Sequence, residues 1–146
     1  MIAKRIAVLL CAVSIVLLLS ACSLNAGTTK NAQIVLGESK TFSSDEISAA
    51  KDCVMKKFKE FEGCDLLELR YDEERSIREV NDYMSTGRGQ VNGVARENII
   101  VLHSSFYVDS SGGDGSLNPD SEYSGWMWIL VRDNEHSAWR VDDWGY

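Results

Sequence analysis

The stretch from Asn98 to Val108 constrains the fold more than any other part of this 146-residue sequence. Its alternate residues form two sets, and both are largely apolar: Ile100, Leu102, Ser104, Phe106 and Val108 on one face, and Ile99, Val101, His103, Ser105 and Tyr107 on the other. Successive side chains of a strand point to opposite faces, so a strand of this kind needs a cover on each side. We therefore predict a central strand here.

The strongest local signal for a helix lies near residue 44. Ser43 and Glu46 have the spacing of a capping box, and Phe42 can pack on Ile47 across it. Apolar residues then recur at helical spacing, at Ile47, Ala50, Val54, Phe58 and Phe61. The sequence predicts a helix from about 44 to 62, ended by Gly63, with one buried stripe.

Further strands and a second helix follow from shorter patterns. Leu67, Leu69 and Tyr71 alternate with charged residues, which predicts a strand over 64 to 71 that pairs antiparallel with later strands. Residues 126 to 132 and 138 to 144 predict a hairpin. Residues 76 to 85 predict a short helix with Ile77 and Val80 facing inward.

This order of elements is typical of an α+β domain, which we place at residues 41 to 146. The helix over 44 to 62 is the one predicted element large enough to cover a sheet face. We therefore expect a long N-terminal helix packed on a curved antiparallel sheet of about four strands, a cystatin or NTF2-like roll. A flatter two-layer sandwich of the same elements is the alternative.

The second apolar face of the sheet needs a cover of its own. Trp126 and Trp128 share a strand face with Leu130, while Met127 and Ile129 lie on the opposite one. One face belongs to the long helix. The candidates for the other are a second copy of the chain in a homodimer, a ligand, and the loop over 110 to 124 folded back; plain core filling explains the tryptophans as well.

The first 21 residues have the order of an export signal. Lys4 and Arg5 precede an apolar run over 6 to 19, and Leu19-Ser20-Ala21-Cys22 follows. The run is shorter than a membrane-spanning helix requires. The tetrapeptide resembles the lipobox of bacterial lipoproteins, which implies removal of residues 1 to 21 and a lipid on Cys22. Residues 22 to 40 would then form a flexible tether with a reach of roughly 25 Å.

Charge and cysteine content limit the partners. The chain has 15 basic and 22 acidic residues, and two of the basic ones, Lys4 and Arg5, leave with the signal, so the mature part carries a net charge of −9. Such a surface repels phosphate backbones and argues against nucleic-acid binding. Cys53 and Cys64 are either a disulfide or two half-buried thiols.

Three C-terminal motifs carry a resemblance to a known group of proteins: SSGGDGSLNP at 110 to 119, WMWILVRD at 126 to 133 and DWGY at 143 to 146. They resemble a family of small uncharacterised lipoproteins and exported proteins from clostridial-type Gram-positive bacteria. The resemblance implies an NTF2-like fold and a location at the membrane. It transfers no catalytic residue.

No motif in the mature chain predicts an activity, a cofactor or a metal site. The glycine-rich stretch 111 to 115 lacks the lysine of a phosphate-binding loop, and Pro119 stands where an EF-hand loop needs glycine. We expect the loop over 110 to 124 to be ordered, because its glycines permit positive φ and its aspartates can accept amide bonds. The candidate binding residues, proposed from residue type and position alone, are His103, Tyr107, Asp109, Asp114, Trp126 and Trp128.

Two functions remain open at this point. The first is a non-enzymatic binding or interaction domain, anchored by lipid on the outer side of the cytoplasmic membrane, with a protein or small-molecule partner. The second is a small hydrolase or isomerase-like enzyme that uses the interior of an NTF2-type cone. A deep pocket that holds His103 beside a carboxylate would favour the enzyme, and a filled interior would favour binding.

Overall fold

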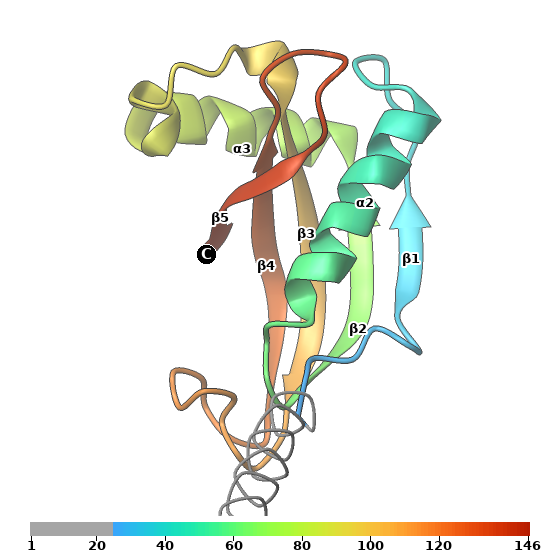
Figure 1. The fold of residues 1–146 in the computed structure, drawn as a ribbon, viewed down its shortest axis with the longest axis vertical. Coiled ribbons are helices and arrows are strands. Elements are labelled where there is room, and N and C mark those ends of the chain that lie inside the picture. The colour runs from blue at the N-terminus through green and yellow to red at the C-terminus, as the bar shows by residue number, and fades with distance from the viewer. Residues whose placement is uncertain (1–24) are drawn as a thin grey trace, which may run out of the picture.

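The computed structural model describes residues 25–146, so the export signal and Cys22 lie outside the described residues. A five-stranded sheet forms the centre, in the order β1-β2-β3-β4-β5 (Figure 1). Its strands are β1 Gln33–Leu36, β2 Cys64–Tyr71, β3 Ile99–Val108, β4 Ser121–Val131 and β5 Arg140–Gly145. β1 runs parallel to β2, and every other pair is antiparallel. The doubly apolar strand, β3, is central, as predicted.

The predicted architecture of one long helix on a four-stranded antiparallel roll is wrong. The domain is α+β, but it has two helices, one on each face of a five-stranded mixed sheet. The prediction missed β1, because four residues between polar neighbours carry little periodic signal. It also treated the second helix as too short to cover a sheet face.

Helix α2, Ser44–Phe58, packs on the first face of the sheet. Ser43 caps it, and the reciprocal bonds of the capping box with Glu46 are both present. Its buried stripe is Ile47, Ala50, Val54 and Phe58, as predicted. The helix ends four residues early, and Phe61 lies in the following turn, where its ring stacks 5.4 Å from that of Phe58.

Helix α3, Glu73–Thr86, covers the second face (Figure 1). Asp72 caps it by accepting the amide of Arg75 at 2.8 Å. Val80 and Tyr83 pack on Ile99, Val101, Ile129 and Val131. Ile77, expected to face inward, is 47% exposed, and Ser76 takes the buried position, where its hydroxyl accepts the amide of Val101 at 3.0 Å. The second apolar face of the sheet is therefore covered by a helix of this chain.

Strand β2 contains an irregularity that the alternating pattern did not show. The pairing with β3 shifts between Leu66 and Glu68, so Leu67 is 40% exposed. The buried face consists of Cys64, Leu66, Leu69 and Tyr71. A bulge inserts one residue and reverses the alternation beyond it. The antiparallel pairing itself was predicted correctly.

The β3–β4 loop is shorter than expected, because β4 already begins at Ser121. Asp109 accepts the amide of Ser111 at 2.8 Å, and Asp114 accepts that of Ser116 at 3.0 Å. Leu117 packs against the core under α2. The loop is thus an ordered element with the hydrogen bonds that its composition predicted, on the α2 side of the sheet.

Residues assigned to the tether from sequence belong in part to the domain. Residues 33 to 36 form β1, and Thr28 forms a bridge with Asp65. Gly27 donates to the carbonyl of Lys59 at 3.1 Å. The chain is therefore fixed to the domain from its first described residues.

Candidate functional site

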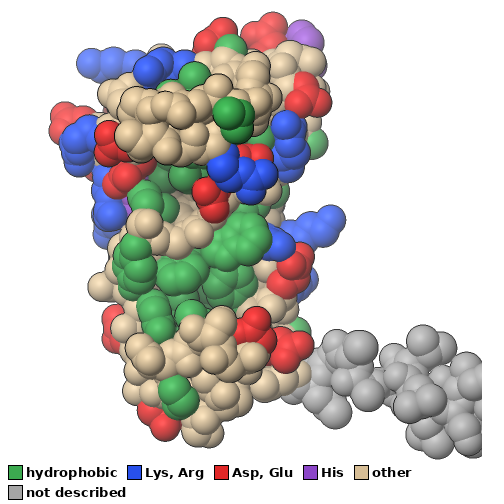
Figure 2. Space-filling view, turned by 90° about the vertical axis from the view of Figure 1, so that its left-hand side faces the viewer, with side chains coloured by type: hydrophobic (Ala, Val, Ile, Leu, Met, Phe, Trp, Pro, Cys, Tyr) green, Lys and Arg blue, Asp and Glu red, His purple; other side chains and the backbone are tan. Residues whose placement is uncertain are grey.

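A cleft of about 260 Å³ lies where the end of α2, the β3–β4 loop, β4 and β5 meet. We call it the aromatic cleft. Its lining consists of three aromatic residues, a row of charged and polar side chains, and parts of the loop: Phe61, Trp126 and Trp144; Lys57, Glu60, Glu62, Asp114 and Ser116; and Gly113 and Leu117. Figure 2 shows the molecule from the side that bears β5 and the β3–β4 loop. Hydrophobic side chains, in green, gather in the middle of this face.

The aromatic wall continues beyond the cleft itself. Trp126 packs edge-on against Phe61 at 6.2 Å and against Tyr146 at 5.3 Å. Trp144 is 43% exposed and Tyr146 is 73% exposed. The indole N–H of Trp126 is buried without an acceptor among residues 25–146. Exposed aromatic surface with polar neighbours is typical of a binding site.

The polar wall already holds one cation against an aromatic ring. The Lys57 ammonium lies 4.6 Å from the centroid of the Trp144 ring and 2.5 Å from a carboxylate oxygen of Glu60. Glu62 and Asp114 add two more carboxylates to the lining. The hydrogen bonds from the Ser116 hydroxyl and amide lower the pKa of Asp114, so it is ionised at neutral pH. The cleft therefore has an excess of negative charge.

Tyr107 and Asp109, two of the residues proposed from sequence, lie at the edge of the β3–β4 loop and do not line the cleft. The Tyr107 hydroxyl donates to Asp120 at 3.2 Å. Hydrogen bonds from Ser111 lower the pKa of Asp109. Both groups hold the loop in place rather than face a ligand space.

His103 lies on the opposite face of the sheet and is 3% exposed. Its Nε2 is 3.5 Å from Glu79, and neither ring nitrogen has a hydrogen-bond partner within the described chain. Burial and the nearby Arg75 charge outweigh the attraction of Glu79 and lower the pKa of His103 to about 4. The imidazole is neutral at physiological pH, and it does not line the aromatic cleft.

Trp128 is fully buried, and its indole N–H donates to the Ser104 hydroxyl at 2.8 Å. It belongs to the core under α2. Of the six residues proposed from sequence, the structure brings only Asp114 and Trp126 into one site. Phe61 and Trp144 were not predicted as site residues, because the sequence pattern placed Phe61 in the buried stripe of the helix and Trp144 in the last strand.

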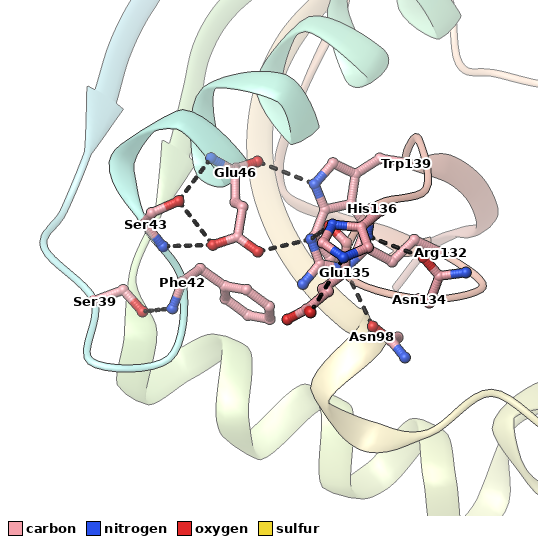
Figure 3. A network of polar contacts seen from close by, with 10 residues as sticks. All are labelled: Ser39, Phe42, Ser43, Glu46, Asn98, Arg132, Asn134, Glu135, His136 and Trp139. Atoms are coloured by element: carbon pink, nitrogen blue, oxygen red, sulfur yellow. Dashed lines mark hydrogen bonds and ion pairs between the residues drawn. The ribbon is translucent and has the colours of Figure 1, made fainter.

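A second polar cluster joins α2 to the β4–β5 hairpin (Figure 3). The Arg132 side chain is only 6% exposed, and its guanidinium lies 2.7 Å from Glu46 and 4.5 Å from the Trp139 ring. The Trp139 indole donates to the carbonyl of Glu46 at 3.0 Å, and Arg132 also donates to Asn98 at 3.2 Å. These contacts tie α2 to the hairpin through one buried guanidinium, so the cluster stabilises the fold.

A further cavity of about 290 Å³ lies between α3 and the segment before α2. Phe42, Ile77, Val80 and Ile99 make most of it apolar. It lacks the combination of exposed aromatic rings and carboxylates found in the aromatic cleft.

Cys53 and Cys64 are free thiols, and burial raises the pKa of Cys64 to about 11, which leaves it unreactive.

Two features are absent from residues 25–146. No group of His, Cys, Asp and Glu side chains there is arranged to hold a metal ion. In the same part of the chain, no helix has both the length and the apolar content that crossing a membrane requires.

Comparisons with known proteins give a family. The model of a domain of unknown function, DUF4829, matches residues 29–145. No curated protein and no solved structure matches the chain. A family without an assigned function agrees with the resemblance seen in the sequence, whereas its C-terminal motifs and the NTF2-like fold are not confirmed. The matched residues include the whole sheet, both helices and the entire aromatic cleft, and the chain therefore belongs to the DUF4829 family.

Proposed function

We propose that this protein is a lipid-anchored binding protein of the cell envelope whose mature domain binds a cationic ligand in the aromatic cleft. The anchor is proposed from Leu19-Ser20-Ala21-Cys22. The ligand is a small molecule or a partner's side chain that carries an ammonium or guanidinium group on an apolar body. The domain itself acts by binding and not by catalysis.

The observation that carries this proposal is the position of Lys57. Its ammonium lies over the Trp144 ring at 4.6 Å and beside Glu60 at 2.5 Å. A cation over the face of an aromatic ring is attracted by the ring's quadrupole, and indole is the strongest such partner. The same ring and carboxylate would attract a ligand cation that displaces Lys57 or lies beside it.

The charges of the lining favour a cation over an anion. Lys57 is the only basic residue of the lining, against the carboxylates of Glu60, Glu62 and Asp114. An anionic ligand would meet two carboxylates that Lys57 does not neutralise. A neutral apolar ligand would gain the contact with Phe61 and Trp126 alone. The ring contact alone is worth about 0.5 to 2 kcal/mol to a cation.

The enzyme hypothesis lacks a comparable observation. It required His103 and a carboxylate in a deep pocket, but His103 is buried and its contact with Glu79 is 3.5 Å long. The interior on that side is filled by Val80, Tyr83 and the β3 and β4 side chains. Binding is therefore the function that the geometry supports best.

The test uses choline as a cationic probe and 3,3-dimethyl-1-butanol as its uncharged counterpart, with binding followed by calorimetry. We expect choline to bind roughly tenfold more tightly, which corresponds to about 1.4 kcal/mol. Trp144→Leu should abolish that preference. Lys57→Met should strengthen choline binding, because it removes the competing ammonium.

The matched control is Ile77→Ala, which alters the exposed side chain in the cavity beside α3 and should leave choline binding unchanged. Equal affinity for the two probes would contradict the cationic ligand. Unaltered choline binding by Trp144→Leu would show that the aromatic cleft is not the site.

A further inference from the structure

We infer that a spacer of only two residues, Ser23 and Leu24, holds the cleft end of this domain directly against the lipid surface. The inference rests on the proposed lipidation of Cys22 and adds the orientation of the domain relative to the membrane, which a flexible tether over 22 to 40 would not fix. The end in question consists of Asn25 to Thr28, Lys59 to Gly63 and the β3–β4 loop; we call it the anchor end.

The N-terminal segment is fixed to the anchor end by four backbone hydrogen bonds. Gly63 donates to the carbonyl of Asn25 at 2.8 Å, and Gly27 donates to that of Lys59 at 3.1 Å. Thr28 donates to Cys64 and accepts from Leu66, both at 2.9 Å. A Cβ on Gly27 would lie 2.2 Å from the carbonyl oxygen of Phe58, so the backbones are in close contact here. The chain is thus part of the domain from Asn25 onward.

The remaining spacer is too short to lift the domain away from the membrane. From Cys22 to Asn25 the chain advances three residues, which span at most about 10 Å when fully extended. The headgroup layer on one side of a bilayer is itself roughly 5 to 8 Å thick. A lipid on Cys22 places that residue at the base of this layer, so Asn25 can rise only a few ångströms above it.

The anchor end and the aromatic cleft share residues, so the cleft lies close to the membrane. Glu60, Phe61 and Glu62 line the cleft, and the next residue, Gly63, is bonded to Asn25. The β3–β4 loop joins the same end, because the backbone amide of Asp109 donates to the carbonyl of Gly63 at 2.9 Å. The opposite end, with the β4–β5 turn at 133 to 138, lies beyond the length of β4 (Figure 1). Eleven residues of strand extend roughly 36 Å.

Electrostatics does not create this contact. The anchor end carries more carboxylates than basic groups, among them Glu60, Glu62, Asp109, Asp114 and Asp120. Anionic headgroups repel such a surface within a Debye length of about 10 Å at 0.1 M salt. The covalent spacer therefore imposes the contact, and zwitterionic lipids should allow a closer approach than anionic lipids.

The experiment measures energy transfer from a label on the protein to labelled headgroups, with the full lipidated chain in zwitterionic vesicles. Cysteine is introduced at Ser110, an exposed residue of the anchor end, or at His136 in the β4–β5 turn, in a Cys53→Ser background. A matched variant carries 20 Gly/Ser residues inserted after Ser23, which extends the spacer to roughly 26 Å. The background without an introduced cysteine reports any labelling of the buried Cys64.

We expect strong transfer from Ser110→Cys, weak transfer from His136→Cys, and loss of the difference in the inserted variant. Equal transfer from both positions with the native spacer would overturn the inference while leaving the lipid anchor intact. Membrane recovery of Cys22→Ala distinguishes a failure of the lipid anchor from a failure of the proposed orientation alone. If that variant still fractionates with membranes like the wild type, the lipid anchor and the inference that depends on it are both wrong.

Discussion

The contact between Arg132 and Glu46 predicts a stability cost that can be separated into two parts. Glu46 serves both the capping box of α2 and the buried guanidinium. One of its oxygens accepts the amide of Ser43 at 2.8 Å, and the other lies 2.7 Å from Arg132 (Figure 3). Glu46→Gln keeps a residue suited to the capping box but removes the charge. Ser43→Ala removes the cap and keeps the charge.

The magnitudes follow from burial. Removal of one partner from a fully buried ion pair costs about 3 to 5 kcal/mol. The Arg132 side chain is 6% exposed, but that of Glu46 is 31% exposed, and Arg132 keeps its bond to Asn98. We therefore expect about 2 kcal/mol for Glu46→Gln, less than the fully buried range. Ser43→Ala should cost about 1 kcal/mol. Glu46→Ala should cost about 3 kcal/mol, because it removes the charge beside Arg132 and also the bond that the carboxylate accepts from the Ser43 amide.

The assay is urea denaturation at pH 7, followed by tryptophan fluorescence, with Arg132→Met as the second arm of a double-mutant cycle. In the Arg132→Met background no buried charge remains, so Glu46→Gln should cost less than about 0.5 kcal/mol. An equal cost in both backgrounds would contradict this prediction, because it would show that Arg132 does not depend on the Glu46 charge.

Two further predictions concern His103 and the β3–β4 loop. Burial lowers the pKa of His103 to about 4, so the unfolded chain binds a proton first, and the free energy of unfolding should fall by up to about 3 kcal/mol as the pH decreases from 6.5 to 4. His103→Leu should make the free energy of unfolding less dependent on pH between 6.5 and 5. An unchanged pH dependence would show that another group titrates. Gly113 has φ of 67°, and a Cβ there would lie 3.2 Å from the Glu62 carbonyl oxygen, so Gly113→Val should lower the free energy of unfolding by about 2 kcal/mol. Hydrogen exchange across 110 to 118 as fast as in an unstructured peptide would contradict an ordered loop.

Most of the local structure could be predicted from the sequence, because it depends on neighbouring residues. The capping box at Ser43, the central strand β3 and the turn chemistry of the loop are all set by side chains a few positions apart. Exceptions arose where tertiary contacts override a pattern. The bulge at Leu67 follows from pairing with β3, and β1 is held in the sheet by β2 rather than by its own periodicity.

The candidate site was harder to predict, because its residues come from four separate segments. Trp126 and Asp114 could be proposed from residue type, but their proximity to Phe61 and Trp144 depends on how the β3–β4 loop folds toward α2. The position of His103 could not be predicted, for a physical reason. A histidine on a strand can serve catalysis or fill a core, and only the position of α3 shows that this one is buried.

The most direct test of a cation site in the aromatic cleft is the indole N–H region of a ¹⁵N NMR spectrum during a choline titration. The chain has four tryptophans, of which Trp126 and Trp144 line the aromatic cleft, while Trp128 and Trp139 belong to the core. We expect saturable shifts of the Trp126 and Trp144 signals, with Trp128 and Trp139 unchanged. Shifts of all four signals together, or no shift at Trp144, would contradict a cation site in this cleft.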